Sequence, residues 1–154
     1  MQQPFINITV PVYNEEKVLA ASTGTLEAML REHGCNYEVV IANNASTDGT
    51  LQIARSLEAQ SKRVRVLHLD EKGRGRAVKA AWRQSAADIL CYMDVDLSTS
   101  LSALPRLIDD RKPHERQLRF GSRFAIAQRV SNSTWIEARV HLSRLQPVSE
   151  RDVR

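Results

Sequence analysis

The chain has 154 residues and a mass of 17.4 kDa, with 42% hydrophobic and 26% charged residues, a composition that fits one globular domain and excludes a disordered or fibrous protein. It contains no stretch of about 18 apolar residues and no basic, apolar leader, so we expect a cytoplasmic protein. The net charge is +4, but aromatic residues make up only 5% and no motif of nucleic-acid-binding proteins is present, so we expect no nucleic-acid partner.

The first predicted unit is a strand followed by a helix. Phe5 to Val10 is rich in β-branched and aromatic residues and is followed by Pro11, a pattern typical of a buried strand that ends in a loop. Asn14 can cap a helix, and apolar residues recur at helical spacing from Glu15 to about His33. Gly34 follows, in the position where glycine commonly ends a helix.

The order strand, polar loop, helix is then repeated. Tyr37 to Ala42 is predicted as the second strand, residues 43–50 as a turn rich in capping residues, and Leu51 to Gln60 as the second helix. Val64 to Leu69 is the third predicted strand.

The third unit ends in a glycine-containing turn from Lys72 to Arg76 and an alanine-rich helix that we expect to run to about Ala87. A fourth strand is predicted from Ile89 to Met93. The signals weaken after that point. We expect a short strand from Leu118 to Gly121 and a helix from Trp135 to Leu145.

Strands that alternate with helices predict an α/β fold with a mostly parallel sheet flanked by helices, because parallel strands need crossover connections. Ligands bind such sheets at the carboxyl ends of the strands. Three polar segments fall there, namely residues 11–15, 43–48 and 94–98.

Asp94 and Asp96 are predicted to hold a metal ion. They follow an apolar strand, and alternate residues at a strand end can project two carboxylates toward one side of the sheet edge. Mg²⁺ and Mn²⁺ prefer oxygen ligands and are commonly held by one or two carboxylates together with substrate phosphates. We therefore expect a Mg²⁺ or Mn²⁺ cofactor.

The sequence resembles the family 2 glycosyltransferases, and within them the branch of dolichyl- or polyprenyl-phosphate mannose or glucose synthases. The resemblance covers roughly residues 5–145 and rests on five stretches that match in order and spacing. They are Val10 to Glu15, Asn43 to Thr50, Gly73 to Ala77, Met93 to Ser98, and Gly121 to Arg123.

The resemblance implies a GT-A (Rossmann-like) fold that is incomplete at the C-terminus. We expect residues 1–145 to form the partial nucleotide-sugar-binding domain and residues 146–154 to form a tail. The family continues beyond Ser143 and Arg144 through further elements, so we expect a truncated chain.

The resemblance also implies roles for individual residues. Pro11, Tyr13 and Glu15 are expected to line the nucleotide base and ribose, and Asp94 and Asp96 to reach the metal and the diphosphate, with Asp96 also catalytic. For Tyr13, an ordinary exposed loop position is the alternative.

Asn43 and Asn44 stand where the family usually has acidic residues that accept a hydrogen bond from the base. An amide oxygen still accepts, but without charge assistance the bond is weaker.

The acceptor site is implied by three residues near the end of the chain. The resemblance places Arg123, Arg139 and Ser143 around the acceptor phosphate, with Arg123 also catalytic. For Arg139 and Ser143, an ordinary helix face is the alternative.

The expected activity is inverting, metal-dependent transfer of a hexose from a nucleotide diphosphate sugar, of the GDP-mannose or UDP-glucose type, to a polyprenyl phosphate at the inner face of the membrane. The alternatives are a non-catalytic nucleotide-binding fragment and a family 2 transferase that acts on a polysaccharide or other glycan. A dinucleotide-binding protein is a poor alternative because Gly73-x-Gly75 lacks the third glycine of that motif.

Basic residues are concentrated in one segment. Residues 61–83 contain eight lysines and arginines and two acidic residues. This pattern fits solvated helix faces, a phosphate-bearing ligand or an anionic membrane surface.

Overall fold

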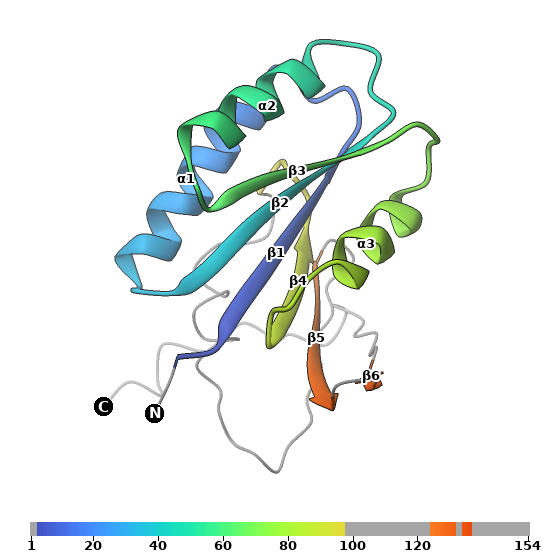
Figure 1. The fold of residues 1–154 in the computed structure, drawn as a ribbon. Coiled ribbons are helices and arrows are strands. Elements are labelled where there is room, and N and C mark those ends of the chain that lie inside the picture. The colour runs from blue at the N-terminus through green and yellow to red at the C-terminus, as the bar shows by residue number, and fades with distance from the viewer. Residues whose placement is uncertain (1–2, 98–123, 132–133, 137–154) are drawn as a thin grey trace, which may run out of the picture.

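A computed structural model of the chain describes residues 3–97, 124–131 and 134–136 (Figure 1). These residues form a six-stranded sheet with the strand order β3-β2-β1-β4-β5-β6. The strands are β1 (Phe5–Val12), β2 (Asn36–Asn44), β3 (Val64–Leu69), β4 (Ile89–Met93), β5 (Phe124–Ser131) and β6 (Thr134–Ile136). The pairs β1–β2, β1–β4 and β2–β3 are parallel, whereas β4–β5 and β5–β6 are antiparallel.

Helices cover both faces of the parallel part of the sheet. Helices α1 (Leu19–Glu32) and α2 (Thr50–Gln60) lie on one face, and α3 (Arg74–Arg83) lies on the other (Figure 1). Each helix connects two parallel strands, as the alternating pattern of the sequence requires. The predicted α/β class with a mostly parallel sheet is confirmed.

The main core lies between the sheet and α1. Alternate residues of β1, such as Ile8 and Val10, are buried against Leu26 and Leu30 of α1, together with Val39 of β2. Complete burial of each of these side chains stabilises the fold by about 1.5–3 kcal/mol. This core makes the central strands a rigid support for the loops at their carboxyl ends.

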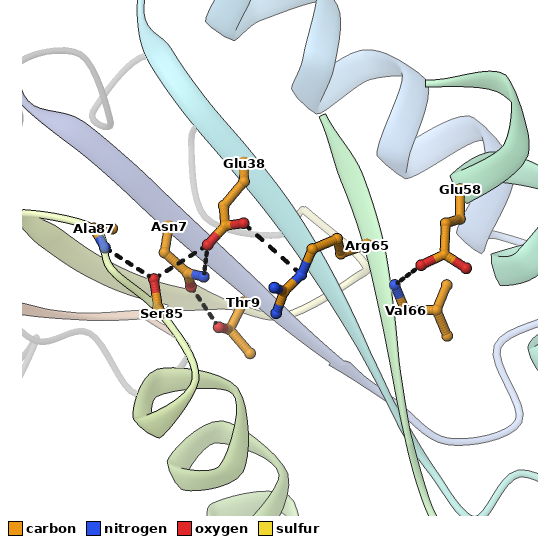
Figure 2. Close-up of polar contacts among 8 residues, drawn as sticks. All are labelled: Asn7, Thr9, Glu38, Glu58, Arg65, Val66, Ser85 and Ala87. Atoms are coloured by element: carbon orange, nitrogen blue, oxygen red, sulfur yellow. Dashed lines mark hydrogen bonds and ion pairs between the residues drawn. The ribbon is translucent and has the colours of Figure 1, made fainter. Parts of the chain in front are cut away.

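The other face of β1 carries polar residues that are just as buried (Figure 2). The Asn7 amide donates to a Glu38 carboxylate oxygen at 2.7 Å and accepts from the Thr9 hydroxyl at 2.8 Å. The Ser85 hydroxyl donates to the same Glu38 oxygen at 3.1 Å, and Arg65 pairs with the other oxygen at 3.8 Å. The network joins three strands to the segment that follows α3.

Helix α1 begins four residues later than predicted. The expected start was Glu15, but Asn14 has a positive φ of 54° and its side chain bonds to the neighbouring loop, so it does not cap the helix. Val18 is the capping residue, and no side chain there bonds to the helix end. The predicted helix end is correct, because Gly34 has a φ of 63° and Cys35 N–H donates to the Leu30 carbonyl at 3.0 Å.

Two other predicted helices differ from the structure. Helix α3 ends at Arg83 rather than near Ala87, because Ser85 leaves the helix and accepts the Ala87 N–H at 3.2 Å. The helix predicted from Trp135 is wrong at its start, since Trp135 and Ile136 pair with β5 as strand β6. The predicted strand at residues 118–121 lies outside the described residues.

Candidate donor-binding site

The carboxyl ends of the parallel strands bring three predicted binding segments to one edge of the sheet. Val12 at the end of β1 is in register with Asn43 of β2, and Thr9 of β1 is in register with Tyr92 of β4. The segments 13–18, 45–49 and 94–97 therefore leave the sheet side by side, as the position of ligand sites in such folds requires. Pro11 lies beyond the last β1–β4 register pair, where its missing N–H costs no bond to β4.

The first two loops are tied together by Asn14. Its amide oxygen accepts the Thr47 N–H at 2.8 Å, its amide nitrogen donates to the Thr47 hydroxyl at 3.2 Å, and its own N–H donates to the Ser46 hydroxyl at 3.1 Å. Asparagine tolerates the left-handed backbone found here better than most residues. Because Tyr13 directly precedes Asn14, these bonds fix the backbone next to Tyr13.

A second set of bonds holds the start of α2. The Glu16 carboxylate accepts the Gly49 N–H at 2.8 Å, and a side chain at position 49 would place Cβ only 2.9 Å from that carboxylate. The Glu15 N–H donates to the Thr50 hydroxyl at 2.7 Å. Half-buried Glu15 therefore belongs to a loop whose backbone is fixed by α2.

Asp48 caps this region through its carboxylate. It accepts the Thr50 N–H at 3.0 Å and the Thr50 hydroxyl at 2.5 Å. Desolvation acts to raise the pKa of Asp48, but hydrogen bonds from the Thr50 hydroxyl, the Thr50 N–H and the Glu16 N–H outweigh it and lower the pKa. The carboxylate is thus stabilised in its charged form.

Tyr13 and Lys72 form one side of the site. Tyr13 is 38% exposed, so part of its ring is open to solvent. The Lys72 ammonium donates to the Tyr13 hydroxyl and lies 4.2 Å from the centre of its ring. An exposed aromatic ring next to a cation offers a stacking surface and a positive charge to the same ligand.

Asp94 and Arg74 form the other side. The Asp94 carboxylate, half-buried at the end of β4, pairs with the Arg74 guanidinium from the first turn of α3. The guanidinium carbon also lies 5.8 Å from the centre of the Tyr92 ring. The sequence did not predict a role for Arg74, although the basic turn from Lys72 to Arg76 was a signal that could have found it.

Asn43 and Asn44 lie on opposite faces of the sheet. Asn44 accepts the Gly73 N–H at 2.7 Å through its amide oxygen, on the face that α3 covers. Asn43 is completely buried on the other face, where its amide nitrogen lies 2.8 Å from Nδ1 of His68 and its amide oxygen has no partner among the described residues. Asn44 therefore positions the turn that carries Lys72 and Arg74.

Asp94 and Asp96 occupy the same turn, which the Leu97 N–H closes by donating to the Asp94 carbonyl at 3.3 Å. Asp96 is exposed, and Asp94 is half-buried and already attracts the Arg74 cation. Among the described residues, no group of three or more histidine, cysteine or acidic side chains could hold a metal ion. The hard oxygen donors of this pair nevertheless fit a divalent ion that a substrate phosphate helps to bind.

The predicted acceptor residues Arg123, Arg139 and Ser143 lie outside the described part of the chain. In the part that is described, no helix is both long enough and apolar enough to span a bilayer.

Comparisons with known proteins bear on the family and the fold of the chain. The chain is 32% identical over 124 residues to the glycosyltransferase AglD of Haloferax volcanii, a match that covers 77% of this chain and 20% of AglD. It is 28% identical over 127 residues to the dolichol-phosphate mannosyltransferase of Pyrococcus furiosus, which covers 82% of this chain and 35% of that protein. The chain thus spans between 20% and 35% of the length of these curated relatives.

A solved structure and a family model complete the comparison. The mannosyltransferase PcManGT from Pyrobaculum calidifontis, solved in complex with GDP-Man and Mn²⁺, matches with a TM-score of 0.58 at 24% identity, over 71% of this chain and 34% of that chain. This likeness confirms the GT-A fold. The model of glycosyl transferase family 2 matches residues 7–151. The chain therefore belongs to glycosyl transferase family 2.

Proposed function

We propose that this chain carries the donor-binding part of a metal-dependent, inverting glycosyltransferase that moves a hexose from a nucleotide diphosphate sugar to a polyprenyl phosphate. The observation that carries the proposal is the grouping of Asp94, Arg74, Lys72 and Tyr13 at the carboxyl edge of the sheet. An aromatic ring, two cations and a carboxylate meet the needs of a base, a diphosphate and a divalent ion.

The names of the relatives support the donor and the acceptor. The Pyrococcus furiosus relative is a dolichol-phosphate mannosyltransferase, and PcManGT binds GDP-Man with Mn²⁺. We propose the same two substrate classes for this chain, with a Mg²⁺ or Mn²⁺ cofactor. Acting on a lipid phosphate would place the enzyme at the inner face of the membrane.

Different residues are proposed to contact different parts of the donor. Pro11, Tyr13 and Glu15 are proposed to line the base and ribose, with Asn43 or Asn44 as an acceptor for the base. Asn44 retains 8% exposure and Asn43 has none, so Asn44 is the more accessible of the two.

Asp94 and Asp96 are proposed to hold the cation and, through it, the diphosphate. A bound divalent ion would act as a Lewis acid and neutralise the charge that grows on the departing nucleoside diphosphate. An ionised acceptor phosphate needs little deprotonation, so the transfer would not require a strong general base. Arg123, Arg139 and Ser143 are proposed to hold that phosphate, since arginine pairs with phosphate oxygens in a fork.

The proposal is tested with a panel of nucleotide sugars. Each is added to the chain with Mn²⁺ or with a chelator, and thermal unfolding is followed. We expect one nucleotide to protect the chain only when the ion is present, by about 2.7 kcal/mol at 100 times its dissociation constant. Protection that is equal with and without the ion would contradict the metal role, and no protection by any member would contradict the function.

A further inference from the structure

The turn between β3 and α3 brings two cations to the donor site. Lys72 and Arg74 are separated by Gly73, whose N–H is fixed by Asn44. The Arg74 side chain is 51% exposed, so it contributes little to the core. Two exposed cations held by a fixed turn indicate a role in binding an anion.

The residue that each cation contacts indicates which part of a ligand that cation would bind. Lys72 contacts Tyr13, which is proposed to line the nucleotide, and Arg74 contacts Asp94, which is proposed to hold the metal ion. In a bound nucleotide diphosphate, the diphosphate lies between the nucleoside and the ion. The two cations therefore flank the place that the diphosphate would occupy.

The contact between Arg74 and Asp94 is exchangeable. Ion pairs that water can reach contribute only about 0–1 kcal/mol, and both side chains of this pair are partly exposed. The planar fork of a guanidinium group matches phosphate oxygens as well as carboxylate oxygens in geometry. Arg74 can therefore leave Asp94 for a phosphate at little cost.

We infer that Lys72 and Arg74 bind the diphosphate of the donor. Until the donor and its cation bind, Arg74 stays paired with the Asp94 carboxylate. This inference rests on the proposed function and adds two residues to the site. In the resting state the guanidinium balances the charge of Asp94. On donor binding, the Arg74 guanidinium would move to a diphosphate oxygen, and the Asp94 carboxylate would then be free to hold the divalent ion.

A matched control lies on the same helix. Arg76 is 56% exposed and pairs with Glu71 rather than with a residue of the site. Arg76→Gln removes one positive charge from the same segment, so it reports the general effect of charge on anion binding.

The first experiment measures dissociation constants of GDP and UDP in Mn²⁺ by calorimetry, with guanosine and uridine as ligands that lack phosphate. Arg74→Gln and Lys72→Gln are expected to weaken binding of whichever diphosphate the wild type binds by about fivefold to tenfold, a smaller loss than a buried charge-assisted bond would give because both side chains are exposed to water. Nucleoside binding should stay unchanged, and Arg76→Gln should change diphosphate binding by less than about twofold. Arg74→Lys keeps the charge without the fork and should fall between Arg74→Gln and the wild type.

The second experiment measures binding of Mn²⁺ alone by electron paramagnetic resonance. Arg74→Gln should bind Mn²⁺ about twofold or more tightly than the wild type, because the competing guanidinium is gone. A merely structural Arg74 would not produce this gain. Unchanged or weaker Mn²⁺ binding would overturn the exchange at Asp94.

The outcomes separate this inference from the proposed function. If the wild type binds neither diphosphate, both fail together. If the wild type binds a diphosphate and Asp94→Asn abolishes that binding, the donor site stands, and unchanged affinity in Arg74→Gln and Lys72→Gln overturns the inference alone. Equal losses for the nucleosides would also overturn it, because the cations would then act on the base or on the fold.

Discussion

At the scale of single residues, the site combines positions that the sequence identifies with positions that it does not. Asp94 and Asp96 are recognisable because two carboxylates follow an apolar strand. Arg74 is not, because its partner Asp94 is 20 positions away and only the crossover of α3 brings them together. The sequence predicts Asn14 as a helix cap because asparagine is common at that position. An asparagine side chain can equally bond to a neighbouring loop, as it does here to Thr47, and the sequence does not distinguish the two.

Asn14 is expected to matter through both its backbone and its side chain. Asn14→Ala should lower the free energy of unfolding by about 1–2 kcal/mol, because alanine disfavours the positive φ and loses the bonds to Thr47. Asn14→Asp keeps the acceptor for the Thr47 N–H and tolerates this backbone, so it should lose less than about 0.5 kcal/mol. Urea unfolding of both variants checks the order, and equal losses would contradict it.

At the scale of elements, polar side chains fix how neighbouring segments pack. Glu38 joins Asn7 of β1, Arg65 of β3 and Ser85 after α3 (Figure 2). The Glu58 carboxylate of α2 accepts the Val66 N–H of β3 at 2.9 Å (Figure 2). The sequence predicts most of the elements that carry these residues but not their bonds, because a polar residue within a strand or helix gives no sign of its partner.

Removing Asn7 should destabilise the sheet. Asn7→Ala leaves the Thr9 hydroxyl and one Glu38 oxygen without the buried amide, and a buried polar group without its partner costs about 1–3 kcal/mol. Asn36→Ala, at an exposed position in β2, is the control and should change the free energy of unfolding by less than about 0.5 kcal/mol. Chemical denaturation of both variants tests this, and a similar effect in each would mean that the network contributes nothing specific.

Glu58 should make stability depend on pH in the acidic range. The hydrogen bond from the Val66 N–H is the main cause that lowers the pKa of Glu58. A carboxylate with a lowered pKa stabilises the fold above its unfolded pKa of about 4.3, and this contribution is lost as the pH falls through the folded value.

Glu58→Gln tests that contribution. The variant should lose about 0.5 kcal/mol at pH 7, a small value because a third of the side chain is exposed to water. The difference from the wild type should shrink as the pH falls below about 4. Glu32→Gln, at an exposed position of α1, provides the comparison. A loss in Glu58→Gln that is constant from pH 7 to pH 3 would show that the charge is not involved.

At the scale of the whole molecule, the sequence predicts the parallel part of the sheet well and the rest poorly. The four parallel strands are apolar runs rich in β-branched residues and are separated by helical patterns, so their existence and the α/β class follow from the sequence. Strand β5 was missed and Trp135 was assigned to a helix. Both strands are antiparallel additions at the edge of the sheet, where short apolar segments leave helix and strand hard to distinguish.

The central claim is that the edge formed by Asp94 and Asp96 binds a nucleotide diphosphate through a divalent cation. The most direct measurement is calorimetric titration of GDP and UDP into the wild type and into the Asp94→Asn, Asp96→Asn double variant, each with Mn²⁺ and with a chelator. We predict that the wild type binds one of the two diphosphates only with Mn²⁺, and that the double variant, still folded by circular dichroism, does not bind it. Equal affinity in the double variant would contradict the claim.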